Sequence, residues 1–124
     1  MSRSQQGSDA LTELAARVRE DLARIGYASG SWSIPVTHED GHVLDVAIVG
    51  AGQGGQTTCF ALRRQGISNV EVFDRAQRGG EGPWVTFARM LTLRTPKHVT
   101  GPDLGIPSLT PQSWYEARYG VEAW

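Results

Sequence analysis

The stretch 43-VLDVAIVGAGQGG-55 joins a short apolar run to a cluster of glycines. The run over residues 43–49 does not alternate with polar residues, which is typical of a strand covered on both faces in a parallel sheet. Residues 53–65 then predict a helix that Gly66 ends, and residues 69–73 predict a second strand that closes on Asp74. Strand, turn, helix and strand together have the length of a βαβ unit, about 30 residues.

The glycines follow the pattern G-x-G-x-x-G at Gly50, Gly52 and Gly55, and Asp74 follows at nearly the expected spacing of about 20 residues. The first glycine allows a tight turn, the second lets a pyrophosphate approach the backbone, and the third lets the helix pack on the strand. Free N–H groups at the helix start favour an anion. Asp74 can accept ribose hydroxyls and would repel a 2′-phosphate, which disfavours NADP here. We favour a dinucleotide-binding turn over a structural turn that binds nothing.

A second glycine pair, Gly79-Gly80, and then Trp84 follow the acid. The segment from Asp45 to Gly80 resembles the N-terminal FAD-binding segment of flavoproteins that have two dinucleotide-binding domains. The run to Trp84 is similar to the GG-x-x-W region of flavin-containing, Baeyer–Villiger and N-hydroxylating monooxygenases. Residues 90–97 and 100–107 look like a bacterial subgroup described as FAD/NAD(P)-binding oxidoreductases, so the resemblance covers about residues 44–120.

The resemblance implies a Rossmann-like FAD-binding domain with a parallel sheet, and it implies FAD contacts but no catalytic residue. The implied contacts are Gly50, Gly52, Gln53, Gly54 and Gly55 at the pyrophosphate, Asp74 and Arg75 at the adenosine ribose, Gly82, Pro83 and Trp84 towards the flavin, and Arg94 at a phosphate or the flavin edge. The sequence departs from the family pattern in three places. Asp74 replaces the commoner Glu, the spacing before Trp84 is longer, and Cys59 stands where a small Ala is typical.

The N-terminal part predicts three pieces: a disordered leader over residues 1–8, then a helix and a connector over residues 9–42. Ser8 or Asp9 can cap the helix, and Gly26 can end it. An apolar stripe recurs at helical spacing at Leu11, Leu14, Ala15, Val18, Leu22 and Ile25. The stripe must cover a partner helix or the body of the protein, and we expect the body.

Two shorter segments complete the outline. The connector carries His38, Glu39, Asp40 and His42, which could suggest a metal site, but a loop without fixed geometry favours a solvated turn, and we expect no metal. Within the partial FAD-binding domain expected over residues 43–124, residues 110–120 predict a short helix with Thr110 as its cap.

Composition narrows the classes of partner. The 124 residues include 12 Lys and Arg against 13 Asp and Glu, a net charge of −1, whereas nucleic acid binding needs a basic face. Cys59 is the single cysteine, so an internal disulfide is impossible. The sequence has no apolar run of the roughly 20 residues that a membrane helix needs and no secretion signal at its start. We therefore expect a cytoplasmic protein without a membrane or nucleic acid partner.

One glycine-rich turn and two parallel strands are less than a stable sheet needs. We expect the N-terminal segment of a longer enzyme, one half of a split enzyme whose remainder is a second chain, or a remnant that forms homo-oligomers. The first functional hypothesis is a flavin-dependent monooxygenase that acts on a small molecule, with NAD(P)H bound outside this segment. The alternatives are a non-catalytic nucleotide-binding module and a fragment of an NAD-dependent dehydrogenase, although Gly79-Gly80 and Trp84 argue against the latter.

Overall fold

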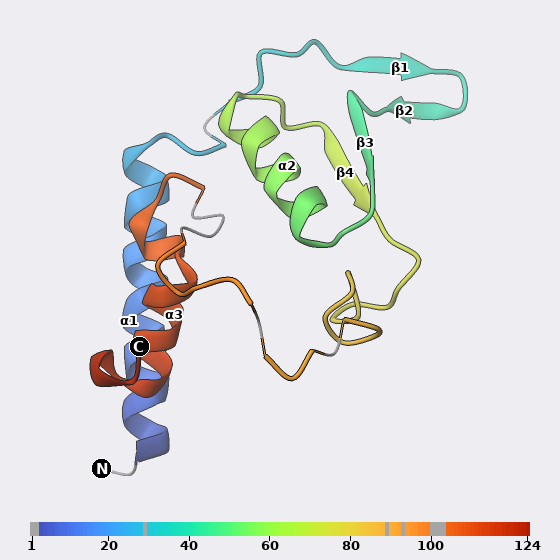
Figure 1. The fold of residues 1–124 in the computed structure, drawn as a ribbon. Helices are drawn as coiled ribbons and strands as arrows, with labels where there is room; N and C mark the ends of the chain where they lie inside the picture. Colours follow the sequence, from blue (N-terminus) through green and yellow to red (C-terminus); the bar gives the residue numbers. More distant parts are fainter. Residues whose placement is uncertain (1–2, 29, 89, 93, 100–103) are drawn as a thin grey trace. The chain divides into compact units, whose positions relative to one another are not determined.

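The structure is a computed structural model that describes residues 3–28, 30–88, 90–92, 94–99 and 104–124. The chain divides into two compact units, unit 1 with Met1–Tyr27 and Lys97–Trp124, and unit 2 with Ala28–Pro96 (Figure 1). This division differs from the expected boundaries at residues 8 and 42, because the C-terminal residues pack on the N-terminal helix. Residues 100–103, which carry part of the subgroup resemblance, lie outside the described residues.

Unit 1 is helical. Its elements are the helix α1 (Arg3–Arg24), the 3₁₀ turn η1 (Pro107–Leu109), the helix α3 (Pro111–Tyr119) and the 3₁₀ turn η2 (Val121–Ala123). The apolar stripe of α1 packs on α3 and η1, and Leu14 in this stripe is only 7% exposed. The stripe is therefore covered by a helix of the same chain, which is the alternative that we did not favour. In the described part of the chain, neither α1 nor any other helix has the length and apolar character needed to cross a membrane.

The helix α1 starts earlier than the sequence predicted. It begins at Arg3 instead of after a cap at Ser8 or Asp9, so residues 3–8 are helical and not a leader. This extension brings α1 close to α3, since a Cβ on Gly7 would lie 3.1 Å from the carbonyl oxygen of Arg118. At the other end Gly26 has φ 63° and its N–H bonds to Ala23, so the predicted stop is confirmed.

The predicted C-terminal helix is present with its caps. The Thr110 hydroxyl accepts a hydrogen bond from the Ser113 N–H at 3.0 Å, and Pro111 occupies the first helical position. Gly120 follows the helix with φ 97°, which favours glycine. The Thr110 side chain caps the start of α3 and the positive φ of Gly120 marks its end, as the sequence indicated.

The connector contains an antiparallel hairpin that the sequence pattern did not indicate. Its strands are β1 (Val36–His38) and β2 (Gly41–Val43), with Val36 opposite Val43. Both strands are exposed, so their pattern lacks the alternation by which a half-buried strand is identified. The His38 Nδ1 lies 3.4 Å from the Asp40 Oδ2 at the exposed tip, and the described residues contain no group of three metal-ligating side chains.

The centre of unit 2 is a βαβ unit. The strands β3 (Val46–Val49) and β4 (Val70–Phe73) pair in parallel, and the helix α2 (Gln53–Arg64) connects them. The fold class of unit 2 is therefore α/β with a small parallel sheet. The first strand begins at Val46, three residues later than predicted, because Val43 pairs in the hairpin instead.

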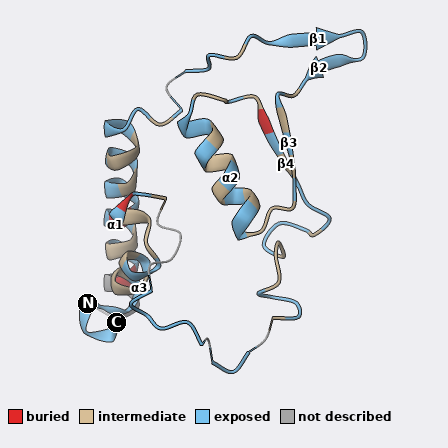
Figure 2. Ribbon diagram, turned by 45° about the horizontal axis from the view of Figure 1, so that its top comes forward, coloured by how far each residue is buried: buried red, intermediate tan, exposed pale blue. Residues whose placement is uncertain are grey.

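Only one face of this sheet is covered. Val46 and Ile48 of β3 alternate with exposed Ala47 and Val49, and Val49 is 90% exposed. On β4, which contacts α2, Val70 is 4% exposed and pairs with Val46. Figure 2 shows a buried segment in this two-stranded sheet next to α2. The prediction of a strand buried on both faces was wrong for this chain, because Ala47 and Val49 on the second face are exposed.

A tryptophan attaches the connector to the end of α2. The Trp32 indole N–H donates to the Gln65 carbonyl at 2.8 Å, and the Trp32 backbone N–H donates to Gly66 at 3.3 Å. Gly66 has φ 78°, and a Cβ there would lie 2.9 Å from the Trp32 ring. Gly66 thus ends the helix as predicted and also leaves room for the ring.

Candidate nucleotide-binding site

The glycine-rich turn, residues 50–55, begins at the carboxyl end of β3. Gly50 has φ 104°, a conformation that an L side chain rarely adopts. Its N–H donates to the Phe73 carbonyl at 2.7 Å, which extends the parallel ladder by one bond. The chain therefore leaves the strand in the tight turn that the first glycine of the pattern predicts.

The two glycines that start α2 differ sharply in their surroundings. A Cβ on Gly55 would overlap the Gly50 carbonyl oxygen and lie 3.0 Å from its carbon. A Cβ on Gly54 would meet nothing within 4 Å. Gly52 faces the backbone of Gly82, since its Cβ would lie 3.4 Å from the Gly82 Cα. Close packing of helix on strand thus requires glycine at position 55 alone.

The start of α2 offers backbone donors. Gly52 is its N-cap residue and makes no side-chain capping bond, and the Gln56 N–H returns to the Gly52 carbonyl at 3.0 Å. Within the described part of the chain, the N–H groups of Gln53, Gly54 and Gly55 donate to no backbone carbonyl outside the helix. Such N–H groups and the helix dipole together favour an anion at this end.

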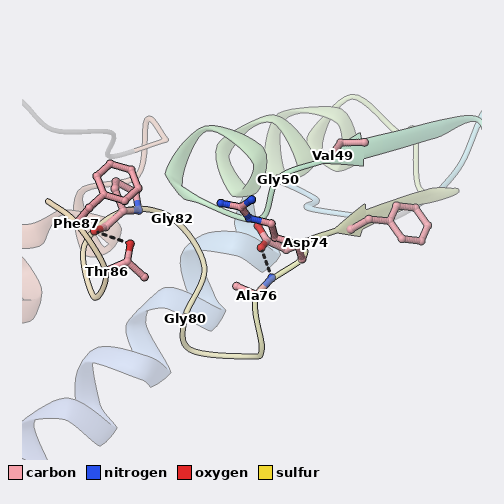
Figure 3. Close-up of a pocket in the computed structure, with 11 residues that line it drawn as sticks. Val49, Gly50, Asp74, Ala76, Gly80, Gly82, Thr86 and Phe87 are labelled. Carbon is pink, nitrogen blue, oxygen red and sulfur yellow. Dashed lines mark hydrogen bonds between the residues drawn. The ribbon is translucent and has the colours of Figure 1, made fainter.

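Asp74 lies directly against the turn (Figure 3). Its Oδ2 accepts from the Ala51 N–H and its Oδ1 from the Ala76 N–H, both at 2.7 Å. These bonds, Ala76 first and then Ala51, hold the pKa of the carboxyl below its usual value, with a smaller contribution from the Arg75 charge. The side chain is exposed, so an ionised acceptor faces solvent beside the turn.

A pocket of about 660 Å³ opens at this edge of the sheet, within the size range of small-molecule and cofactor sites. Its lining residues are Val49, Gly50, Phe73, Asp74, Arg75, Ala76, Gly80, Gly82, Pro83, Thr86 and Phe87. The pocket thus connects the end of the turn, the acid and the loop after β4.

The pocket includes part of the predicted set. Five expected residues line it: Gly50, Asp74, Arg75, Gly82 and Pro83. Six do not: Gly52, Gln53, Gly54, Gly55, Trp84 and Arg94. The four turn residues among these lie at the start of α2, and Arg94 is exposed elsewhere in unit 2.

The loop after Pro83 contributes residues that we did not expect. Trp84 is 52% exposed and outside the lining, whereas Thr86 and Phe87 of the same turn line the pocket. Val49 and Phe73 were also missed, although each is the last residue of a parallel strand and could have been found from that position. No sequence signal singles out Phe87.

A parallel strand, a glycine-rich turn, a helix start with free N–H groups and an acid after the next strand are together typical of dinucleotide-binding βαβ units. The chain is similar to a protein named FAD-dependent urate hydroxylase from Xanthomonas campestris pv. campestris, with 49% identity over 114 residues. The match covers 92% of this chain and 24% of the relative, so the chain spans about a quarter of its length. This similarity relates the chain to an FAD-dependent oxidoreductase. No family model and no solved structure matches the chain.

Proposed function

We propose that this chain is the FAD-binding part of a flavin-dependent oxidoreductase, within a partial Rossmann-like domain. The observation that carries the proposal is the Asp74 carboxylate, which lies one hydrogen bond from the turn whose N–H groups can receive a pyrophosphate. The pocket volume and the similarity to an FAD-dependent relative point in the same direction.

The described residues fit an adenine dinucleotide. The N–H groups of residues 53–55 would receive the pyrophosphate, with Gly52 at its side, and Gly50 has open space where a Cβ would stand. Asp74 would accept the hydroxyls of the adenosine ribose, with Arg75 beside it. Gly82, Pro83 and Trp84 would lie towards the flavin, and Arg94 at a phosphate or the flavin edge.

Bound FAD would supply the electron transfer, and the residues of this chain would bind and orient it. We propose NAD(P)H, bound outside this segment, as the reductant. The proposed reaction is monooxygenation of a small molecule, and urate is the first candidate because it appears in the name of the relative. The remainder of such an enzyme, on a second chain or a second copy, would cover the face that carries Val49.

The test is a flavin fluorescence titration of the 124-residue chain, with NAD titrated separately. We expect saturable quenching by the chain and no displacement of FAD by an equal concentration of NAD. The variant Glu71→Gln, which changes an exposed carboxylate on β4, serves as the control and should bind FAD like the parent. A chain that ignores FAD would remove the proposal, and a preference for NAD would favour a dehydrogenase fragment.

A second candidate is a nucleotide-binding module without catalysis. It is favoured by the pocket lining, in which Asp74 and Arg75 are the titratable residues and both belong to the ribose end. NADPH oxidation, followed with excess FAD and urate, tests the module. Steady consumption of NADPH by the chain would exclude the module, whereas FAD binding without consumption is expected of both candidates, because the proposed enzyme binds NAD(P)H outside this segment.

A further inference from the structure

Asp74 connects the two loops that leave the parallel sheet at one edge. Its carboxylate accepts the Ala51 N–H on one oxygen and the Ala76 N–H on the other, both at 2.7 Å. Ala51 lies between two glycines of the turn, and Ala76 lies in the loop after β4. We call this arrangement the Asp74 bridge.

The register of the strands places the bridge. Val49 lies opposite Phe73, and the Gly50 N–H donates to the Phe73 carbonyl, so Gly50 and Asp74 directly follow the paired ends of the two strands. From this position the Asp74 carboxylate reaches the N–H of the next turn residue, Ala51. One methylene separates the Asp74 backbone from its carboxylate. A Glu at this position would carry the carboxylate about 1.5 Å farther, so we expect it to lose the geometry of the two short bonds.

The turn needs such an anchor. Glycines at positions 50, 52, 54 and 55 give its backbone more freedom than other residues would, and ordering that backbone costs entropy. The first turn of α2 has no side-chain cap. Hydrogen bonds to an ionised carboxylate are about twice as strong as neutral ones, so Asp74 is well suited to hold this backbone.

We propose that Asp74 is a positioning residue that holds the glycine-rich turn in its nucleotide-binding conformation before any ligand arrives. The bridge is compatible with a ribose contact, because each exposed carboxylate oxygen has a second acceptor direction. The bridge itself stands on the ligand-free geometry, and its effect on a nucleotide rests on the proposed function.

Amide hydrogen exchange of the ligand-free 124-residue chain, measured by NMR, tests the bridge. In Asp74→Glu, which keeps the charge, the Ala51 and Ala76 amides should exchange about tenfold faster or more. The Gly50 amide, which bonds to the Phe73 carbonyl, should keep its rate. Glu71→Gln, the matched change of a carboxylate on β4, should alter none of the three. Unchanged Ala51 exchange in Asp74→Glu overturns the proposal.

An acid titration of the parent chain needs no variant and decides the matter even if Asp74→Glu fails to fold. Asp74 protonates in this titration, and Arg75 is the charged neighbour that acts on it. The amide proton resonances of Ala51 and Ala76 should move together with one midpoint. If neither resonance moves with the ionisation of Asp74, the bridge does not exist in solution.

Inorganic pyrophosphate separates positioning from ribose binding, because it has no ribose. We expect pyrophosphate to shift the amides of residues 53–55 in the parent, and Asp74→Glu to raise its Kd about fivefold or more. Equal Kd values in the two chains would mean that Asp74 acts on the ribose alone, which overturns the positioning role. If pyrophosphate shifts no amide in the parent, the proposed function fails, while the exchange rates still decide the bridge.

Discussion

The two units of this chain differ in how far they bury their apolar side chains. In unit 1 the stripe of α1 packs on α3 and buries Leu14. In unit 2 the helix α2 covers one face of the β3–β4 sheet, and Val49 and Phe73 remain exposed on the other. The residues that line the candidate site belong to unit 2. The unit with the less complete core is therefore the one that carries the chemistry-bearing residues.

This difference indicates what each unit depends on. Unit 1 depends on side-chain packing between helices that come from the two ends of the chain. Unit 2 depends on backbone geometry, because its glycines permit close approach and its short polar contacts hold the loops. Substitutions that act on packing and substitutions that act on backbone geometry should therefore affect different units.

The largest expected effect is at Gly55. The substitution Gly55→Ala should lower the free energy of unfolding of unit 2 by about 3 kcal/mol, because its Cβ would overlap the Gly50 carbonyl and overpacking is costly. In the neighbouring Gly54→Ala, the added Cβ would lie in open space. This substitution should leave the free energy of unfolding unchanged or raise it by up to about 1 kcal/mol, because Ala has the higher helix propensity. Urea unfolding followed by circular dichroism measures both. Equal losses in the two variants would show that the turn does not pack as described.

The next effect concerns unit 1. The substitution Leu14→Ala removes a nearly buried side chain and should destabilise unit 1 by about 2 kcal/mol. The exposed neighbour Glu13 provides the control, since Glu13→Ala should change little. Amide exchange on α3, compared with exchange on β4, is the measurement. Equal acceleration in both elements would contradict the division into two units.

A smaller effect is expected where the connector meets α2. The substitution Trp32→Phe keeps a ring but removes the indole bond to the Gln65 carbonyl, which should cost about 1 kcal/mol. Trp84→Phe is the matched control, because Trp84 is half exposed and lies outside the pocket lining. The free energy of unfolding from urea titrations should fall for the first variant only. A loss in Trp84→Phe of the same size would mean that ring volume, and not the bond, matters.

The smallest effect is a pH dependence. The pKa of Asp74 is lowered in the folded chain by its backbone bonds, so its ionised form binds these N–H groups and stabilises unit 2. That stabilisation is complete above the unfolded pKa of about 3.9 and is lost as the pH falls through the lower folded pKa. Unfolding midpoints of unit 2 measured from pH 6 downwards should therefore decline in the acid range. Asp74→Asn should show a flatter profile, and identical profiles would contradict the stabilising role.

The sequence predicted the backbone framework of the site well. The spacing of Gly50, Gly55 and Asp74 implied a turn and an acid at one edge of a parallel sheet, and the structure places them there. Motif spacing was sufficient for these residues, because the role of each depends on steric or hydrogen-bonding contacts within the turn and its two flanking strands. Gly26 and Gly120 ended their helices for the same reason.

The rest depended on contacts between distant parts of the chain, which local patterns do not reveal. Gly7 in the early part of α1 lies close to Arg118 of α3, and Phe87 lines the pocket whereas Trp84 does not. The exposed hairpin at β1 and β2 lacks the alternation that burial imposes. The contacts of the turn, the acid and Arg94 with FAD stay predictions.

Amide shift mapping of the 124-residue chain during FAD addition tests the central claim most directly. We predict saturable shifts at Ala51 and at residues 52–55, accompanied by shifts at Arg75 and Ala76 and none on α3 of unit 1. Shifts that are absent from the glycine-rich turn, or that are confined to unit 1, would contradict the claim that this turn holds the cofactor.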